Sequence, residues 1–566
     1  MSTSELLATP SVRDVGRPSA LSLVWGQTVY CTKSFIRTPV AAFFTLLFPT
    51  TFLVVISAVA GNEIIDDRMG IRLAQFLAPV FAVFGICMAS FVSLALGLAY
   101  AREAGVLKRL RGTPLPAWAH IAGRLLTAAF VSLVALVLIV GIGMAFYGVE
   151  IVWRTVPAVL LTIIVGVLCF AALGLAATAL VPTPGATQAV TNGALILLAF
   201  ISDIFVVELP DELDSLGWVF PLKHFTNAVA DGFNPYLNDS GFYWDHLAVM
   251  AAWGVAGVLI ALRFFKWEPH PARAERTSEK KKGKKKEAET VATPDVEPAA
   301  TTATLGEPVV FPSPSWLQMT WGQARYAMLG IVRDPLSVFF AAVFPVLLLV
   351  FFSAIYGNEA TWGGMPLPQY LAAAFAVYGV AVLAYVNLAG SVVEARSRLV
   401  LKRLRGTPLP RSAYLVGRIS AAVGLGLLTI ALILGVGVLL FGVRIPWAYI
   451  LPTLVVFLLT VGALAALGLL LASLVDSPQS AVALALGTLL PLSMISDIFM
   501  NVGELPPVLN SVAWFFPLRH MAWASAHTAV GDPIDSAWFL HVGVILLWGV
   551  VAGLLAWRLF RWEPRR

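Results

Sequence analysis

The chain has 566 residues, of which 59% are hydrophobic and only 12% are charged. A soluble protein carries about a quarter charged residues, so this composition excludes an ordinary soluble protein. The apolar residues occur in runs of about 20, long enough to cross the roughly 30 Å hydrocarbon core of a bilayer as helices. The three cysteines, Cys31, Cys87 and Cys169, show no C-x-x-C spacing and indicate neither a disulfide framework nor a zinc site.

The first 20 residues are polar and lack the apolar core of a cleaved signal peptide, so we expect a cytoplasmic tail at residues 1–20. The next stretch, Leu21–Arg37, mixes aromatic and charged residues and is too polar to span a membrane. It predicts an amphipathic helix that lies in the cytoplasmic interface. Trp316–Arg333 repeats this pattern later in the chain.

Twelve membrane-spanning helices are predicted, six in each half of the chain. In the first half we expect them at residues 39–60, 73–100, 118–147, 155–181, 186–207 and 244–265. In the second half we expect them at residues 337–356, 369–393, 413–442, 447–474, 479–501 and 537–559.

The two halves repeat each other. The ten residues LKRLRGTPLP occur at 107–116 and again at 401–410. Five further short sequence matches, some before and some after this one, occur in the same order in both halves at offsets of 294 to 296 residues. We infer a tandem duplication, with six-helix repeats at residues 21–270 and 313–566.

Residues 271–312, between the repeats, are rich in lysine, proline, alanine and threonine and contain no apolar run. This composition predicts a disordered cytoplasmic linker. Acidic residues surround its lysines, which argues against nucleic acid as a partner and favours a position near anionic membrane lipid.

Charge predicts how the chain is oriented. The loop after the second span of each half is strongly basic, whereas the segment between the fifth and sixth spans of the first half is acidic. Positively charged loops stay in the cytoplasm. We therefore predict an all-α protein of the inner (cytoplasmic) membrane, with both termini and the linker in the cytoplasm. Because six spans are an even number, the two repeats run parallel.

The basic loops are more alike than orientation requires, because many charge patterns would orient a helix equally well. Ten identical residues in both halves indicate a docking surface for a cytoplasmic partner. Arg102-Glu103-x-Gly105, followed by Leu107–Pro114, resembles the signature of ABC-2-type transporter permeases, and the drug- and antibiotic-export branch is the nearest likeness. The resemblance covers both halves.

This resemblance implies two permease units fused in tandem, with a type V exporter-like fold. It implies that the loop after the second span is a coupling helix, which inserts into a groove on an ATPase subunit. The expected partners are two copies of a cytoplasmic ABC ATPase. These partners would bind ATP and Mg, and this chain would hold no cofactor. The segment between the fifth and sixth spans would re-enter the outer leaflet as an external gate.

The resemblance assigns ATPase coupling to twelve residues: Arg102, Glu103, Gly105, Lys108, Arg109 and Arg111 in the first half, and Glu394, Arg396, Arg398, Lys402, Arg403 and Arg405 in the second. The halves differ within this set. At an offset of 294, Ser397 stands opposite Glu103 and Leu399 stands opposite Gly105, while an acid appears earlier as Glu394. Our hypothesis is that the two ATPase contacts are unequal.

Asp203 and Asp497 lie 17 to 19 residues into the fifth spans, about 26–28 Å from their cytoplasmic ends. Two interpretations stay open, an interfacial acid at a helix end or a polar rim of the exit path. The predicted external gate and exit rim comprise Asp203, Phe220, Pro221, His224, Asp497, Phe516, Pro517 and His520. One histidine per half, with no second histidine or cysteine nearby, does not indicate a metal site.

The sequence contains no Gly-x-x-x-x-Gly-Lys-Ser/Thr loop, so we expect no ATP hydrolysis and no enzyme activity in this chain. The expected function is the permease of an ATP-driven exporter. Its cargo would be hydrophobic or amphipathic (drug, antibiotic or lipid), because the spans offer few fixed charges. One alternative is a twelve-helix, proton-coupled efflux transporter, which would need ionisable groups at mid-membrane. Another is a membrane scaffold that transports nothing.

Overall fold

The computed structural model describes residues 19–38, 42–59, 64–66, 71–113, 115–205, 209–264, 314–356, 361–362, 365–444, 446–499 and 505–563. The predicted linker at 271–312 and nearly all of the predicted tail at 1–20 lie outside the described residues.

The first half contains α1 (Ala20–Ile36), η1 (Phe43–Leu47), α3 (Phe48–Val59), β1 (Ile64–Asp66), β2 (Ile71–Arg72), α4 (Leu73–Cys87), η2 (Met88–Ser93), α5 (Leu94–Glu103), α6 (Val106–Arg111), α7 (Ala117–Tyr147), α8 (Val156–Leu180), α9 (Pro184–Phe200), α10 (Asp211–Gly217), α11 (Pro221–Gly232) and α12 (Trp244–Phe264).

The second half repeats this order with α14 (Trp316–Val332), α15 (Pro335–Val338), η3 (Phe339–Val343), α16 (Phe344–Tyr356), β3 (Thr361–Trp362), β4 (Met365–Pro366), α17 (Leu367–Ala381), η4 (Val382–Asn387), α18 (Leu388–Ser397), α19 (Val400–Arg405), α20 (Arg411–Phe441), η5 (Trp447–Tyr449), α21 (Ile450–Leu474), α22 (Pro478–Ile495), α23 (Pro507–Phe515), α24 (Pro517–Val530) and α25 (Ser536–Leu559).

The prediction of an all-α membrane protein is confirmed. Within the described residues, nine helices are long and apolar enough to cross a membrane, and two shorter apolar helices lie at Phe43–Ala58 and Phe339–Ser353. The one predicted span left over, the fifth of the first half, corresponds to α9, which has 17 residues. Two small antiparallel hairpins, β1–β2 and β3–β4, were not predicted; each follows the first span of its half.

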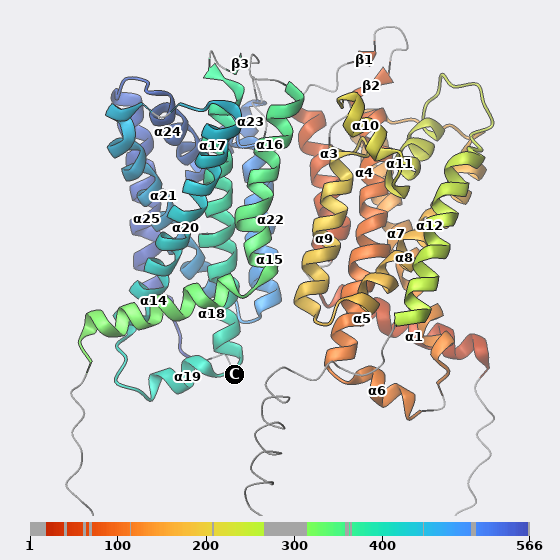
Figure 1. The fold of residues 1–566 in the computed structure, drawn as a ribbon, viewed down its shortest axis with the longest axis horizontal. Coiled ribbons are helices and arrows are strands. Elements are labelled where there is room, and N and C mark those ends of the chain that lie inside the picture. Colours follow the sequence, from red (N-terminus) through yellow and green to blue (C-terminus); the bar gives the residue numbers. More distant parts are fainter. Residues whose placement is uncertain are drawn as a thin grey trace, which may run out of the picture.

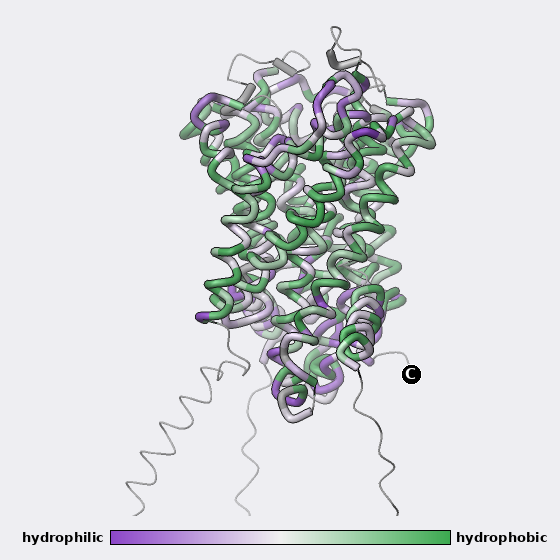
Figure 2. Tube along the Cα trace, turned by 90° about the vertical axis from the view of Figure 1, so that its right-hand side faces the viewer, coloured by the Kyte–Doolittle hydropathy of each residue, from purple (hydrophilic) through white to green (hydrophobic). Residues whose placement is uncertain are grey.

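The two halves stand side by side with the same direction (Figure 1). The basic helices α6 and α19 lie at one end of the molecule, which we name the basic-loop end. The hairpins and the short helices α10, α11, α23 and α24 lie at the opposite end. Figure 2 shows a long, mostly apolar middle region with hydrophilic residues gathered towards the two ends, as a membrane protein requires.

The helices α1 and α14 lie across the basic-loop end, where the sequence predicts interfacial helices (Figure 1). Each packs on the long helix of its own half, α7 or α20, at a glycine. A Cβ at Gly123 would lie 2.5 Å from Gln27 Cβ, and one at Gly417 would lie 2.6 Å from Gln323 Cβ. Only glycine allows these close approaches, so the same contact recurs in both halves.

Four short π-helical segments interrupt the first two spans at matching places in the halves, at η1 and η3 and at η2 and η4. A π-turn contains an extra residue, so it widens the helix locally and turns the side chains that follow. Such turns are frequent at functional sites. All four segments border the space between the halves, as described below.

Apolar contacts join the two halves. Gly193 of α9 faces the ring of Phe339, and Gly487 of α22 faces the ring of Phe43; a Cβ added at either glycine would lie 3.4 Å from the ring. Phe200 of α9 packs on Phe351 of α16, with ring centroids 4.5 Å apart. The duplicated sequence therefore forms an approximately two-fold interface in which each half inserts an aromatic ring against a small residue of the other.

Candidate functional site

A cavity of about 530 Å³ lies between the two halves. Its walls come from the first, second and fifth spans of each half, and most lining residues are phenylalanine, leucine, isoleucine, valine or methionine. None of the described residues that line it carries a charged side chain. Such a space suits a hydrophobic ligand of small-molecule size.

The π-helical segments supply part of this wall. Phe44 of η1 and Phe340 of η3 face the cavity at equivalent positions, and Met88 of η2 is matched by Val382 of η4. The local widening of these spans therefore coincides with the cavity in both halves. The sequence analysis did not find this site, because π-turns leave no clear pattern in a continuous apolar run.

Aromatic rings crowd the cavity end that lies away from the basic-loop end. Phe205 packs on Phe52, Phe84 and Phe200 with centroid distances between 5.2 and 5.9 Å. Its counterpart Phe499 packs on Tyr378 at 5.0 Å. Phe205 and Phe499 come from the repeated sequence Ile-Ser-Asp-Ile-Phe, so this crowding is built from both halves.

Three amide side chains are the exceptions in the apolar lining. Gln188 and Asn192 lie in the first half of α9, and Asn387 ends η4. Gln188 and Phe200, at the two ends of the cavity wall on α9, are separated by about 18 Å along the helix axis. The amide groups thus lie towards the basic-loop end and the crowded rings towards the opposite end.

The two basic helices project from the basic-loop end (Figure 1). Lys108 and Arg109 of α6 are exposed, as are Lys402, Arg403 and Arg405 of α19. Leu107 and Leu401 are fully buried beneath them and anchor each helix to its bundle. Arg111 is the last residue of α6. The predicted basic surfaces are therefore present as short, anchored helices with their charges outward.

Arg102 and Arg396, which we assigned to the coupling surface, are instead buried, at 1% and 2% exposure. Arg102 donates to the carbonyls of Thr178 and Val181 at 2.7 Å and of Pro182 at 3.1 Å. Arg396 donates to the carbonyls of Ala472 and Val475. Both arginines satisfy the last carbonyls of the fourth span, α8 or α21. Their place is structural support beneath the basic helix, since a buried guanidinium cannot contact a partner directly.

The residue before each basic helix has a left-handed backbone. Gly105 has φ of 67° and Leu399 has φ of 58°. Leucine pays a steric cost in this conformation that glycine avoids. The difference between the repeats noted in the sequence is therefore a difference in backbone strain at one identical turn.

The acids next to these turns are exposed but have different surroundings. Glu394 pairs with Arg398 at 2.8 Å, one turn apart on the chain. Arg405 also pairs with Glu563 near the C-terminus, at 3.3 Å. Glu103 is exposed, and no ion pair involves it within the described residues.

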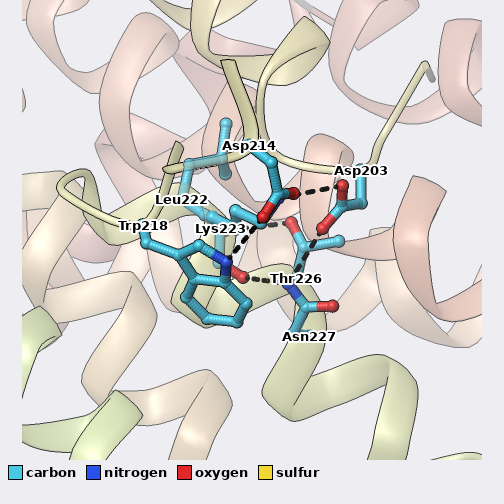
Figure 3. Close-up of polar contacts among 7 residues, drawn as sticks. All are labelled: Asp203, Asp214, Trp218, Leu222, Lys223, Thr226 and Asn227. Atoms are coloured by element: carbon cyan, nitrogen blue, oxygen red, sulfur yellow. Dashed lines mark hydrogen bonds and ion pairs between the residues drawn. The ribbon is translucent and has the colours of Figure 1, made fainter. Parts of the chain in front are cut away.

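A polar cluster lies beneath α10 in the first half (Figure 3). The Lys223 side chain is buried and its Nζ lies 3.2 Å from Asp203 Oδ1; it also pairs with Asp214. Asn227 donates to Asp203 at 3.0 Å, and Trp218 donates to Asp214 at 3.1 Å. The hydrogen bond from Lys223 holds the pKa of Asp214 below its ordinary value. This network ties the end of α9 to α10 and α11.

The second half has the same cluster with different partners. Arg519 replaces Lys223 and lies 3.1 Å from Asp497 Oδ2, and it donates to Asn510 at 2.7 Å. Trp523 donates to Asp497 at 3.1 Å. Asn510 stands where the first half has Asp214, so the first cluster holds two carboxylates and the second holds one.

Asp203 and Asp497 each lie just past the end of a fifth-span helix, α9 or α22. The Asp203 side chain is 13% exposed and the Asp497 side chain 6%, and each is paired to a cation of the segment between the fifth and sixth spans. Both have positive φ, at 59° and 58°, which aspartate tolerates better than most residues. None of the eight predicted gate and rim residues lines the cavity.

The aromatic and proline residues of the predicted gate start its second helix. Pro221 and Pro517 are the first residues of α11 and α24, and Phe220 and Phe516 precede them as N-caps. Proline fits this position because the missing N–H would be unpaired there. Phe220 stacks on Trp253, with centroids 5.9 Å apart. Phe516 stacks on Trp548 at 5.6 Å.

The expectation of one isolated histidine per half is wrong. His224 Nδ1 lies 2.7 Å from His246 Nδ1, and His520 Nδ1 lies 2.8 Å from His541 Nδ1. The second histidine comes from the sixth span, α12 or α25, so sequence distance hid the pair. The described residues contain no group of three or more His, Cys, Asp or Glu placed to hold a metal ion.

A backbone carbonyl fixes one proton of each histidine pair. His224 Nε2 lies 2.8 Å from the Trp218 carbonyl, which can only accept, so Nε2 carries the hydrogen. The Nδ1 atoms of His224 and His246 face each other, so one of them donates to the other. His520 has the same contact with the Trp514 carbonyl at 2.9 Å, and burial lowers the pKa of His520.

Comparison with known proteins identifies both halves. Residues 71–263 match a family model described as "ABC-2 family transporter protein", and residues 320–527 match one described as "ABC-2 type transporter". A search of curated proteins returned no match. Domains of this kind are transmembrane components and not ATPases, and they work with ATP-binding subunits. The chain belongs to the ABC-2 transporter family and carries two of its permease domains in tandem, as the membrane component of an ABC transporter.

Proposed function

We propose that this chain is the permease component of an exporter in the inner (cytoplasmic) membrane, which moves hydrophobic or amphipathic compounds such as drugs, antibiotics or lipids out of the cell. The observation that carries the proposal is the apolar cavity between the halves, because both permease units build its wall. Energy comes from ATP, bound with Mg in two copies of a separate ABC ATPase.

The character of the cavity supports this cargo class. Among the described residues, its lining has no charged side chain to bind a hydrophilic ion or to carry a proton. A proton-coupled transporter needs ionisable groups on its pathway. The cavity therefore favours ATP as the source of energy and a largely apolar ligand.

The exposed basic helices α6 and α19 are the proposed contacts for the two ATPase copies. Co-expression with a candidate ABC ATPase, followed by purification, should recover two ATPase copies per chain. Lys108→Ala with Arg109→Ala, or Lys402→Ala with Arg403→Ala, should each release one copy. Lys33→Ala with Arg37→Ala is the matched control, because these exposed basic residues lie in the last turn of α1 and directly after it, at the same end of the molecule. Unchanged binding by all variants would contradict this assignment.

The two contacts are proposed to be unequal. Glu103 is free of ion pairs within the described residues, whereas Glu394 is held by Arg398. Glu103→Ala should therefore lower ATP-driven transport more than Glu394→Ala does. Equal losses in the same proteoliposome assay would overturn the hypothesis.

Transport itself tests the proposed cargo. In proteoliposomes with the ATPase, Phe48→Ala and Phe344→Ala, one from each half of the cavity wall, should lower transport of a hydrophobic dye several-fold. Phe146→Ala is the control, because Phe146 is 77% exposed and lies away from the cavity. Dye movement that follows a proton gradient without ATP would replace the proposal with the secondary-transporter alternative.

A further inference from the structure

A partly buried cation lies where the interfacial helix of the first half meets its bundle. Arg124 of α7 packs against Gly97 of α5, where an added Cβ would lie 3.0 Å from Arg124 Nη1. Its Nε donates to His120 Nε2 at 3.0 Å, and His120 Nδ1 lies 2.9 Å from the side-chain oxygen of Gln27 on α1. Because His120 Nε2 accepts this bond, the histidine is neutral and carries its hydrogen on Nδ1. Arg124 therefore stands in a corner between α1, α5 and α7 and has a neutral neighbour.

The charge of Arg124 has no counterion among the described residues. Its Nη1 and Nη2 donate no hydrogen bond there, no carboxylate forms an ion pair with it, and neither nitrogen is fully enclosed. The helices α1 and α7 contain no acidic residue. Lys33 and Arg37, exposed at the end of α1, add further positive charge. A partly buried cation is costly without an anion, so this corner favours an anionic ligand.

The depth of Arg124 in the membrane suits a lipid phosphate. The helix α7 has 31 residues and is about 46 Å long, which exceeds the roughly 30 Å hydrocarbon core by about 8 Å at each end. Arg124 lies about 10 Å along the axis from Ala117, the first residue of α7. It therefore stands at the boundary between hydrocarbon and headgroups. On α1, Trp25 and Tyr30 are 67% and 61% exposed, and such aromatic residues are enriched at this boundary.

The second half closes the equivalent position with its own side chains. Arg418 corresponds to Arg124, and Ser391 stands where the first half has Gly97. Arg418 Nη1 donates to Ser391 Oγ at 3.4 Å, and the guanidinium lies over the ring of Tyr414, 5.3 Å from its centroid. Arg418 is only 8% exposed. The first half therefore leaves its guanidinium open to a ligand, whereas the second half covers it.

We propose that Arg124 binds the phosphate of an anionic lipid from the cytoplasmic leaflet, in the corner between α1, α5 and α7. The guanidinium Nη groups present N–H donors in the planar fork that suits phosphate oxygens. Lys33 and Arg37 attract the negative headgroup to this corner. The lipid is a bound partner of the permease and not its cargo, so the inference does not depend on the proposed function of the cavity.

Native mass spectrometry of the purified full chain in detergent tests this site, because it resolves each bound lipid. The chain is titrated with phosphatidylglycerol, which is anionic, and with phosphatidylcholine, which has no net charge. Arg124→Met should weaken the tightest phosphatidylglycerol binding about tenfold, as expected for lost hydrogen bonds to a charged group, and should change phosphatidylcholine binding less than about twofold. Arg418→Met is the matched control and should change both less than about twofold, since Arg418 is covered.

Gly97→Ser tests the site without removing the arginine. It introduces the residue of the second half, whose hydroxyl would accept from Arg124 Nη1, and it should weaken phosphatidylglycerol binding several-fold. Unchanged phosphatidylcholine binding shows that each variant is folded. Excess inorganic phosphate should not displace phosphatidylglycerol; if it does, the corner binds a free anion and the lipid assignment is wrong. Unchanged phosphatidylglycerol binding in Arg124→Met, or equal losses in Arg124→Met and Arg418→Met, would also overturn the inference, while the proposed function of the cavity would stand.

Discussion

Single residues explain much of the difference between the two halves. The turn before each basic helix is the clearest case, because Gly105 and Leu399 adopt the same left-handed conformation. A non-glycine residue in this region costs about 1–2 kcal/mol. The second half therefore holds its basic helix on a more strained turn.

Exchanging these residues should reverse the strain. Gly105→Leu should lower the local stability of α6 by about 1–2 kcal/mol. Leu399→Gly should stabilise α19 by less than that, since glycine also gains freedom in the unfolded chain. Hydrogen exchange of the amides in α6 and α19 measures both effects. If Gly105→Leu leaves the exchange rates of α6 unchanged, the strain argument is wrong.

A second residue-scale difference is the Asp214 carboxylate, which Asn510 replaces in the second half. The pKa of Asp214 is lowered in the folded protein by the hydrogen bond from Lys223. Its stabilising effect is therefore complete above the ordinary carboxyl pKa of about 4, and it is lost as the pH falls through the lower folded value. The effect is modest, because the Asp214 side chain is 42% exposed.

In the Asp214→Asn variant, the unfolding temperature should accordingly fall less steeply below about pH 4 than in the unaltered protein. Asparagine fits this position in the second half, where Asn510 accepts from Arg519. Unfolding temperatures of the two proteins, compared from pH 7 down to pH 3, measure the change. If the unfolding temperatures of both proteins fall identically as the pH is lowered, Asp214 does not contribute to stability.

At the scale of elements, the basic helix and the fourth span are joined by a buried arginine. Arg102 donates three hydrogen bonds to carbonyls in the last turn of α8 and directly after that helix. The basic helix α6 begins four residues after Arg102. Arg102 thus fastens the end of α5, from which the chain turns into α6, to the end of α8. The same link joins α19 to α21 through Arg396.

Removing this link should destabilise the protein strongly. Arg102→Ala leaves buried carbonyls unpaired, and we expect a loss of at least about 2–3 kcal/mol in unfolding free energy. Arg109→Ala, on the exposed face of α6, should change stability by less than about 0.5 kcal/mol. Denaturation of both variants in the same detergent compares them. Similar stabilities would mean that the capping bonds are not important.

At the scale of the whole molecule, the two halves meet through apolar contacts that do not depend on the linker. Gly193 with Phe339, and Gly487 with Phe43, place these contacts symmetrically. The halves should therefore associate even as separate chains. Co-expression of residues 1–285 and 286–566 with a tag on one half should co-purify the other.

Gly193→Leu should weaken this association about tenfold, because overpacking a close contact costs on the order of 1–3 kcal/mol. Gly141→Leu is the matched control, since a side chain at Gly141 would meet nothing within 4 Å. Halves that fail to associate without any substitution would show that the covalent link holds the interface together.

The sequence by itself determined the helical membrane class, the duplication and the family. Long apolar runs leave a bilayer as their only stable surroundings. Local signals also placed the basic helices, because charges and turn residues act within a few residues.

Tertiary structure alone decided which polar residues meet. Lys223 with Asp203, and His224 with His246, lie about 20 residues apart on different helices, and helix packing brings them together. Burial also decided that Arg102 caps a helix, whereas Lys108 and Arg109 of the same basic loop are exposed. The cavity depends on contacts between the two halves, and these depend on shape and not on residue type alone.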